Sequence, residues 1–248
     1  MMRKAIFSAL GLLISSFSYA SDDVSSYIVN GSSASTTTFT SFASLFYDSI
    51  EYNGVYGSSS FCGATMLTDQ YVLTAAHCIF DGEGNPNYEY MLFTVVGQTD
   101  DESNFPDSVE TVRASEFYYY SSFSDSSSDL WADDIAIIKL ESSLNISGTV
   151  NRASDETYRD ASNTFIAVGH GKTDSSTNGT ELLQAQVNYV ENETCKAAFT
   201  DGDQLTDKQI CFNGDYDAST GLYNGVCSGD SGGPVYYSDG STYTQVGI

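Results

Sequence analysis

The sequence has 248 residues, 41% of them hydrophobic, which is enough for one large all-β domain or two small packed barrels. It carries 33 Asp and Glu against 9 Lys and Arg, so the formal net charge is −24. This charge argues against nucleic acids and anionic membrane surfaces as partners, because both attract cations. Solubility of an exported protein explains the charge better than an acid-specific function does.

Residues 1–20 have the pattern of a signal peptide. Arg3 and Lys4 supply positive charge, residues 5–14 are mostly apolar, and Ala20 ends the segment. The apolar part is too short to span a bilayer, so we expect cleavage after Ala20 and a secreted mature protein. No later segment is long and apolar enough to be a membrane span. Secretion in turn permits disulfide bonds.

From residue 28 onward, short apolar runs alternate with turns rich in Gly, Ser and Asp. Such runs predict β-strands, at residues 42–47, 61–67, 71–74, 91–96, 109–118, 135–140, 164–168, 182–190, 235–237 and 243–248. Short helical segments are expected at residues 75–80 and 193–199. Many short strands with almost no helix predict an all-β barrel or sandwich, without a linker that would separate two independent domains.

The stretch GVCSGDSGGP, residues 225–234, has two interpretations. Glycines supply special backbone angles, so the stretch fits a tight turn between strands. It also fits a nucleophile loop, in which glycines let backbone N–H groups approach a substrate carbonyl and Ser231 attacks. The second interpretation requires a base and an orienting acid elsewhere in the chain.

Only two histidines are candidates for the base. His170 lies between two glycines with no acid nearby in sequence, which favours a structural role. His77 ends an apolar run, and Asp134 begins another. A carboxylate at the mouth of an apolar strand needs a partner, which an imidazole N–H provides. Asp133 beside it fits a solvated strand-end acid, although the adjacent pair leaves some ambiguity.

The order His77, Asp134, Ser231 is the order of the catalytic triad in chymotrypsin. The chain resembles the trypsin/chymotrypsin family of serine endopeptidases in four blocks, in family order over residues 28 to 248. These blocks are FCGATML with YVLTAAHC at 61–67 and 71–78, DIAIIKL at 134–140, AVGHG at 167–171, and GDSGGP at 229–234. The resemblance implies two packed six-stranded antiparallel β-barrels with the active site in the cleft between them.

The resemblance also implies the role of each site residue. Ser231 attacks the scissile carbonyl, His77 accepts its proton, and Asp134 orients the imidazole. The N–H groups of Gly229 and Ser231 hold the oxyanion. No metal or cofactor is expected, and the partners are protein or peptide substrates of a monomeric enzyme.

By the same resemblance, the cysteines form two disulfides. These are Cys62–Cys78 and Cys195–Cys211, each closing a loop that the chain-entropy model values at about 3 kcal/mol. The fifth cysteine, Cys227, is left over. Only 17 residues follow Ser231, fewer than the family requires, so we expect the chain to be C-terminally incomplete and the second barrel unfinished.

The family makes its proteases as zymogens, and the resemblance extends to the activation site. Residues 21–27 correspond to a propeptide, and residues 28–248 to the protease domain. Cleavage before Ile28 creates an amino terminus that pairs with Asp230. Tyr27 stands where the family commonly has a basic residue, so we expect an activating protease that accepts tyrosine and is not a trypsin.

The specificity pocket is expected at Gly225, Val226 and Ser228. Trypsin-like members have an acid where this chain has Gly225, so we predict small or medium apolar P1 residues and not Lys or Arg. Alternatively, Asp215 or Asp217 lines the pocket, although surface acids are the simpler interpretation in so acidic a chain.

Two other functions compete with a protease. The first is a non-catalytic serine-protease homologue that acts as a binding or decoy module, or an inactive fragment without the C-terminal pocket strand. The intact His77, Asp134 and Ser231 argue against it. The second is a lipase-type hydrolase, which expects a G-x-S-x-G elbow and the order Ser, acid, His, both missing here.

Overall fold

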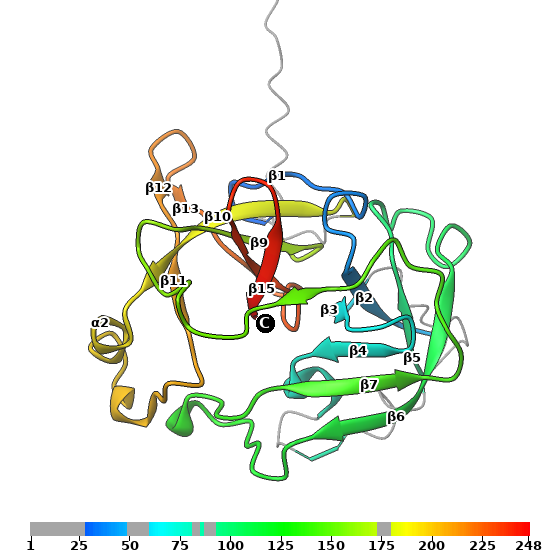
Figure 1. Ribbon diagram of the computed structural model, residues 1–248, viewed down its shortest axis with the longest axis horizontal. Coiled ribbons are helices and arrows are strands. Elements are labelled where there is room, and N and C mark those ends of the chain that lie inside the picture. Colours follow the sequence, from blue (N-terminus) through cyan, green and yellow to red (C-terminus); the bar gives the residue numbers. More distant parts are fainter. Residues whose placement is uncertain (1–27, 49–59, 81–84, 87–92, 173–179) are drawn as a thin grey trace, which may run out of the picture.

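The computed structural model describes residues 28–48, 60–80, 85–86, 93–172 and 180–248, which form two β regions that lie next to each other (Figure 1). The signal peptide and propeptide expected within residues 1–27 lie outside the described residues, as does Tyr27. No helix within the described ranges is long and apolar enough to cross a membrane.

The first region is a closed six-stranded barrel, in the order β2-β3-β4-β7-β6-β5. All neighbouring strands pair antiparallel. Its strands are β2 (Phe42–Tyr47), β3 (Cys62–Met66), β4 (Tyr71–Thr74), β5 (Thr94–Gly97), β6 (Thr111–Tyr119) and β7 (Ala136–Leu140). Apolar residues from alternate positions fill the interior, among them Leu45, Met66 and Ile138, each 0% exposed. The expectation of a six-stranded barrel is confirmed here.

The second region is a seven-stranded sheet in the order β1-β10-β9-β14-β15-β8, with β11 paired to β10. Its strands are β1 (Ser32–Ser33), β8 (Asn151–Arg152), β9 (Thr164–Gly169), β10 (Leu183–Val190), β11 (Cys211–Asn213), β14 (Val235–Ser238) and β15 (Tyr243–Gly247). The strands β15 and β8 pair parallel where an antiparallel pair was expected, and the described strands form no closed ring.

The remaining elements are short. They are the 3-10 helices η1 (Ala76–Ile79), η2 (Ser127–Asp129) and η3 (Gly202–Gln204), the helix α2 (Asn192–Lys196), and the hairpin β12 (Tyr216–Asp217) with β13 (Leu222–Tyr223). Nearly all of the described secondary structure is therefore β, as predicted. The strands missed by the sequence have only two or three residues, so they show no apolar period and depend on their sheet partners.

The two regions meet through side chains that cross between them. Phe42 starts β2 of the barrel, yet it packs in a buried cluster with Val168, Leu182 and Tyr236 of the second region. The hydroxyls of Ser41 and Tyr236 lie 2.9 Å apart in this buried interface. A shared apolar cluster of this kind fixes the relative position of the two regions, and therefore the shape of the cleft between them.

Candidate active site

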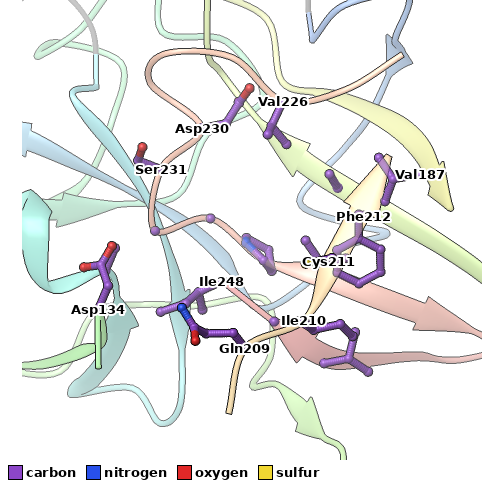
Figure 2. A pocket seen from close by; sticks show the side chains of 18 of the residues that line it. Asp134, Val187, Gln209, Ile210, Cys211, Phe212, Val226, Asp230, Ser231 and Ile248 are labelled. Atoms are coloured by element: carbon purple, nitrogen blue, oxygen red, sulfur yellow. The ribbon is translucent and has the colours of Figure 1, made fainter. Parts of the chain in front are cut away.

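A cleft of about 1010 Å³ lies between the two regions, and His77, Asp134 and Ser231 all line it. Figure 2 shows Asp134 and Ser231 on one side of this pocket, with Val187 and Phe212 on the opposite side. The three residues predicted from the sequence to form a triad are thus brought to one site. The three residues come from three separate segments. Two of these segments belong to the barrel, and the one that carries Ser231 belongs to the second region.

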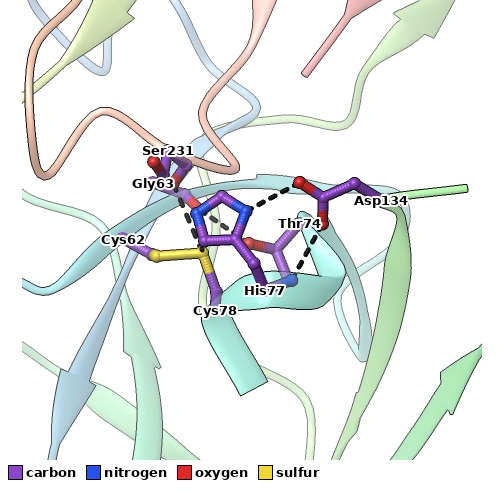
Figure 3. The surroundings of a disulfide bond; sticks show 7 residues. All are labelled: Cys62, Gly63, Thr74, His77, Cys78, Asp134 and Ser231. Atoms are coloured by element: carbon purple, nitrogen blue, oxygen red, sulfur yellow. Dashed lines mark hydrogen bonds and ion pairs between the residues drawn. A yellow bond between two sulfur atoms is a disulfide. The ribbon is translucent and has the colours of Figure 1, made fainter. Parts of the chain in front are cut away.

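His77 and Asp134 meet because their strands are neighbours in the barrel. Thr74, the last residue of β4, pairs with Ala136, the first residue of β7. His77 follows β4 on η1, and Asp134 precedes β7. The Asp134 carboxylate is 2.7 Å from Nδ1 of His77 through Oδ2 and accepts the His77 backbone N–H through Oδ1 at 2.8 Å (Figure 3). Two bonds to one residue fix both its ring and its backbone.

This arrangement sets the protonation of the imidazole. The hydrogen bond to Asp134, opposed in part by burial, raises the pKa of His77 above its ordinary value of 6.5. Because a carboxylate only accepts, Nδ1 carries the proton and Nε2 keeps its lone pair in the neutral ring. His77 is therefore in the tautomer that a general base requires. The adjacent Asp133 instead accepts Lys208 Nζ and the Ser122 hydroxyl, which removes the ambiguity between the two acids.

The loop that carries Ser231 is pressed against the barrel by its backbone. Gly63 of β3 donates its N–H to the Ser231 carbonyl at 2.8 Å, and a Cβ on Gly63 would lie 2.6 Å from Cα of Gly233. Gly232 has φ +77°, and a Cβ there would overlap the Thr74 hydroxyl. Glycines thus permit a close approach that any side chain would block.

The Ser231 carbonyl also lies 3.6 Å from Sγ of Cys78, the residue that follows His77. Within the described part of the chain, the Ser231 hydroxyl makes no hydrogen bond with His77. Such bonds are often long in a free enzyme and shorten when substrate binds. The backbone contacts therefore place the serine beside the base, without yet forming the reactive hydrogen bond.

The predicted oxyanion donors lie in the same loop. Gly229 has φ +103°, a conformation that favours glycine. Among the described residues, the N–H groups of Gly229 and Ser231 donate to no other backbone group. Ser231 lines the cleft, whereas Gly229 is not among the residues that line it.

Asp230 is buried, with 5% of its surface exposed. Its carboxylate accepts the N–H groups of Gly171 and Cys227, each at 2.8 Å. Burial raises its pKa to about 6, although the two amides act in the opposite direction. No Lys, Arg or His of the described residues pairs with it. The carboxylate therefore has amide donors but no cation.

Ile28, the predicted partner of Asp230, is 0% exposed and packs against Leu183 and Ala185. The segment that follows it reaches the predicted pocket, because Gly225 donates its N–H to the Val29 carbonyl at 3.3 Å. The start of the predicted protease domain is thus tied to the pocket by a backbone bond.

The predicted pocket residues have different positions. Gly225 and Val226 line the cleft, and a Cβ on Gly225 would meet nothing within 4 Å. Ser228 is exposed and is not among the residues that line this cleft, because its carbonyl turns to accept the Lys172 N–H at 2.7 Å. Asp215 and Asp217, the alternative pocket acids, do not line it either. Asp215 accepts from Asn188, and Asp217 from Ser219.

Both predicted disulfides are present, Cys62–Cys78 in the barrel and Cys195–Cys211 in the second region. Cys227 forms no disulfide within the described residues. Two disulfide cysteines and His77 are the one group of potential metal ligands found there. Oxidised sulfurs cannot act as thiolate ligands, so this group does not make a metal site.

Sequence reasoning missed one buried pair near the site. His170, which has no acid nearby in sequence, has Nε2 3.7 Å from Oε1 of Glu102, and both side chains are 0% exposed. Glu102 lies in the acidic loop between β5 and β6, where nothing in the sequence distinguishes a buried acid from a solvated one. Only the approach of the two regions reveals the contact.

Comparison with known proteins agrees with this geometry. The family model described as Trypsin matches residues 28–248. Trypsin-1 of Astacus astacus is 32% identical over 193 residues, covering 75% of each chain. Fibrinolytic enzyme isozyme C of Lumbricus rubellus is 30% identical over 187 residues, covering 73% of this chain and 72% of its own.

A solved structure of neuropsin, titled a serine protease expressed in the limbic system of mouse brain, has a similar fold. Its TM-score is 0.65 at 21% identity, over 86% of this chain and 83% of the neuropsin chain. The structural likeness supports the trypsin-like fold, and the family match with its curated relatives supports the lineage. The chain belongs to the trypsin family of serine proteases.

Proposed function

We propose that this protein is a secreted serine endopeptidase that hydrolyses peptide bonds through an acyl-enzyme. The observation that carries the proposal is the double hydrogen bond between His77 and Asp134, at 2.7 and 2.8 Å, in the cleft that Ser231 also lines. A partly buried carboxylate, Asp134, orients the neutral base His77 in the cleft that the glycine-flanked Ser231 lines. This arrangement suits acyl transfer. Protein or peptide chains are the substrates.

In the proposed reaction, the Ser231 hydroxyl attacks the scissile carbonyl while Nε2 of His77 takes its proton. Asp134 keeps the other ring nitrogen protonated and stabilises the imidazolium. The tetrahedral oxyanion accepts the N–H groups of Gly229 and Ser231, each worth roughly 3–4 kcal/mol in comparable enzymes. His77 then protonates the leaving amine, and water repeats the sequence on the acyl-enzyme.

We also propose that the enzyme is made as a zymogen, activated by cleavage before Ile28. Ile28 has φ +39° in the intact chain, which is unfavourable for a β-branched residue, and cutting the preceding bond removes that constraint. Asp230 offers a buried carboxylate without a cation, and a new α-amino group would supply one. N-terminal sequencing of the active form tests this step, and a start at any residue other than Ile28 contradicts it.

For specificity, we propose small or medium apolar P1 residues. Gly225 and Val226 bring no charge to the cleft, so a substrate cation there would lack a partner. A panel of chromogenic peptides that differ only at P1 tests the preference. Cleavage after Val, Ala or Leu should be faster than cleavage after Arg, and the reverse order would refute the proposal.

The central test is covalent labelling with a sulfonyl fluoride or a phosphonate ester after cleavage before Ile28. The cleaved protein should gain one label on Ser231, and Ser231→Ala should gain none. Ser128→Ala, which changes an exposed serine on η2, is the matched control and should label like the unaltered protein. A cleaved, folded protein that stays unlabelled would favour the non-catalytic homologue.

A further inference from the structure

The most unusual buried groups outside the triad are the side chains of His170 and Glu102. Each is 0% exposed, and Nε2 of His170 lies 3.7 Å from Oε1 of Glu102 and 3.2 Å from the Thr99 carbonyl. Because a carbonyl only accepts, Nε2 carries a proton and donates. Nδ1 of His170 and Oε1 of Glu102 have no hydrogen-bond partner among the described residues. Burying a polar group without a hydrogen-bond partner costs free energy, so the position of this pair calls for an explanation.

The contact joins the two regions of the molecule. Glu102 belongs to the β5–β6 loop of the barrel, and its Oε2 accepts the Ser60 N–H at 2.9 Å. The backbone around it is tied to the second region, because Glu102 donates its N–H to the Thr180 carbonyl and Leu182 donates to the Asp100 carbonyl, each at 2.8 Å. Burial raises the pKa of Glu102, and the His170 ring and the Ser60 amide oppose this rise.

The backbone on either side of His170 forms a cradle around the carboxylate of Asp230. A Cβ on either Gly169 or Gly171 would overlap that carboxylate. Gly171 also donates its N–H to Oδ1 of Asp230 at 2.8 Å. The ring of His170 therefore anchors, at its centre, a three-residue segment whose two ends touch the acid that precedes Ser231.

We propose that His170 is a positioning residue, and that its buried contact with Glu102 holds the Gly169–Gly171 cradle on Asp230 and so fixes the Ser231 loop. The contact acts through the backbone and touches no substrate. An apolar residue in place of Glu102 would pack against the His170 ring without orienting it. The Nε2 donor of His170, in contrast, faces defined polar groups. The inference rests on the proposed protease function only for its consequence for catalysis.

Amide hydrogen exchange of Gly171 measures the cradle directly, without any enzymatic activity. Glu102→Gln removes the charge but keeps an acceptor for Ser60. It should raise the exchange rate of the Gly171 amide about tenfold, because the buried carboxylate charge that faces the His170 ring at 3.7 Å is lost. Glu110→Gln, which changes an exposed acid of the same loop, is the matched control and should leave that rate unchanged. Equal Gly171 exchange in the two variants would overturn the proposal.

A second measurement examines the unaltered protein and needs a variant only to assign its signals. The chain has only two histidines, so nitrogen-15 labelling of histidine gives two ring spin systems, which His77→Gln assigns. In the unaltered protein, the His170 ring should show a slowly exchanging Nε2–H proton. A ring without a protected Nε2–H would contradict the anchor.

In the cleaved enzyme, Glu102→Gln should lower kcat about tenfold with KM nearly unchanged, because the oxyanion donors act in the transition state. A merely structural role would lower the unfolding temperature without altering kcat of the folded enzyme, and that result would overturn the catalytic consequence. If the unaltered enzyme proves inactive, the proposed protease function fails. The exchange and ring measurements still decide whether the anchor exists.

Discussion

The closed barrel and the second sheet contribute to the cleft in different ways. The barrel fixes its two catalytic side chains through strand pairing, with Asp134 bonded twice to His77. The second sheet supplies Ser231 on a loop held by glycine contacts and by a buried acid that pairs with no cation of the described residues. One half of the site is thus already assembled, whereas the other half depends on contacts that arrive from elsewhere in the chain.

This difference has a physical reason. A closed barrel satisfies its own backbone hydrogen bonds, so the ends of neighbouring strands have defined positions. A loop at the edge of a sheet has few such bonds and takes its shape from what packs against it. Control of the protease should therefore act on the Ser231 loop rather than on the His77–Asp134 pair.

The largest effect should follow from Asp134→Asn, which removes the carboxylate that the barrel places against His77. Loss of the carboxylate leaves His77 in the wrong tautomer, so kcat of the cleaved enzyme should fall about 10⁴-fold without loss of the fold. The unaltered enzyme should gain activity as pH rises through the His77 pKa, which lies above 6.5, and this limb should move to lower pH in the variant.

Asp133→Asn provides the control for that prediction, because Asp133 is the neighbouring acid but bonds to Lys208 and Ser122. It should keep most of the activity. Equal losses of kcat in the two variants would mean that Asp134 is not the orienting acid.

Each region contains one disulfide, and both disulfides have a sequence separation of 16. Removing them in turn therefore compares the two regions at equal loop length. Replacing either pair by alanine should lower the free energy of unfolding by about 3 kcal/mol in urea titrations. Only the barrel pair adjoins His77, so only its loss should also lower kcat of the folded enzyme. If the variant that lacks the Cys195–Cys211 disulfide also loses kcat, the second disulfide shapes the site as well.

The buried acid of the second region should give the uncleaved chain an unusual dependence on pH. Asp230 has a folded pKa of about 6 against an ordinary value of 3.8, so the folded chain binds more protons between these values. Its contribution to the free energy of unfolding is then present at low pH and is lost as pH rises toward 6. Asp230→Asn should remove this dependence on pH and abolish activation.

Asp239→Asn tests a carboxylate of the same region whose effect on the free energy of unfolding should change with pH in the opposite direction. Four hydrogen bonds from Ser241 and Thr242 hold the pKa of Asp239 well below its usual range, so its contribution is present at neutral pH and is lost on acidification. This variant should therefore be less stable at pH 7. Urea titrations from pH 2 to pH 7 measure both variants. The Asp230 contribution should change between the ordinary value of 3.8 and about pH 6, and the Asp239 contribution only below 3.8, so a shared window would rule out the assigned causes.

The smallest effect concerns the pocket. Gly225→Ala adds a methyl group where nothing lies within 4 Å, so folding should be unaffected. Narrowing the pocket by one methyl should reduce kcat/KM for a Leu P1 substrate about tenfold, with little change for Ala at P1. An unchanged ratio would place the P1 side chain elsewhere in the cleft.

Local patterns in the chain predicted the features that depend on neighbouring residues alone. Residues 42–47 and 71–74 were predicted as strands with the bounds that the structure gives, because each is a clear apolar run. The order and flanking residues of His77, Asp134 and Ser231 predicted a triad, since its chemistry restricts which residue types can stand there.

Features that depend on contacts between segments distant in sequence became visible only in the folded chain. The fold showed that the second region is a seven-stranded sheet, and that Ser228 does not line the cleft. It also brought Glu102 onto His170, and Gly169 with Gly171 around Asp230. Burial and pairing of a charged side chain are properties of the packed neighbours, which are set by the approach of the two regions and carry no local signal in the chain.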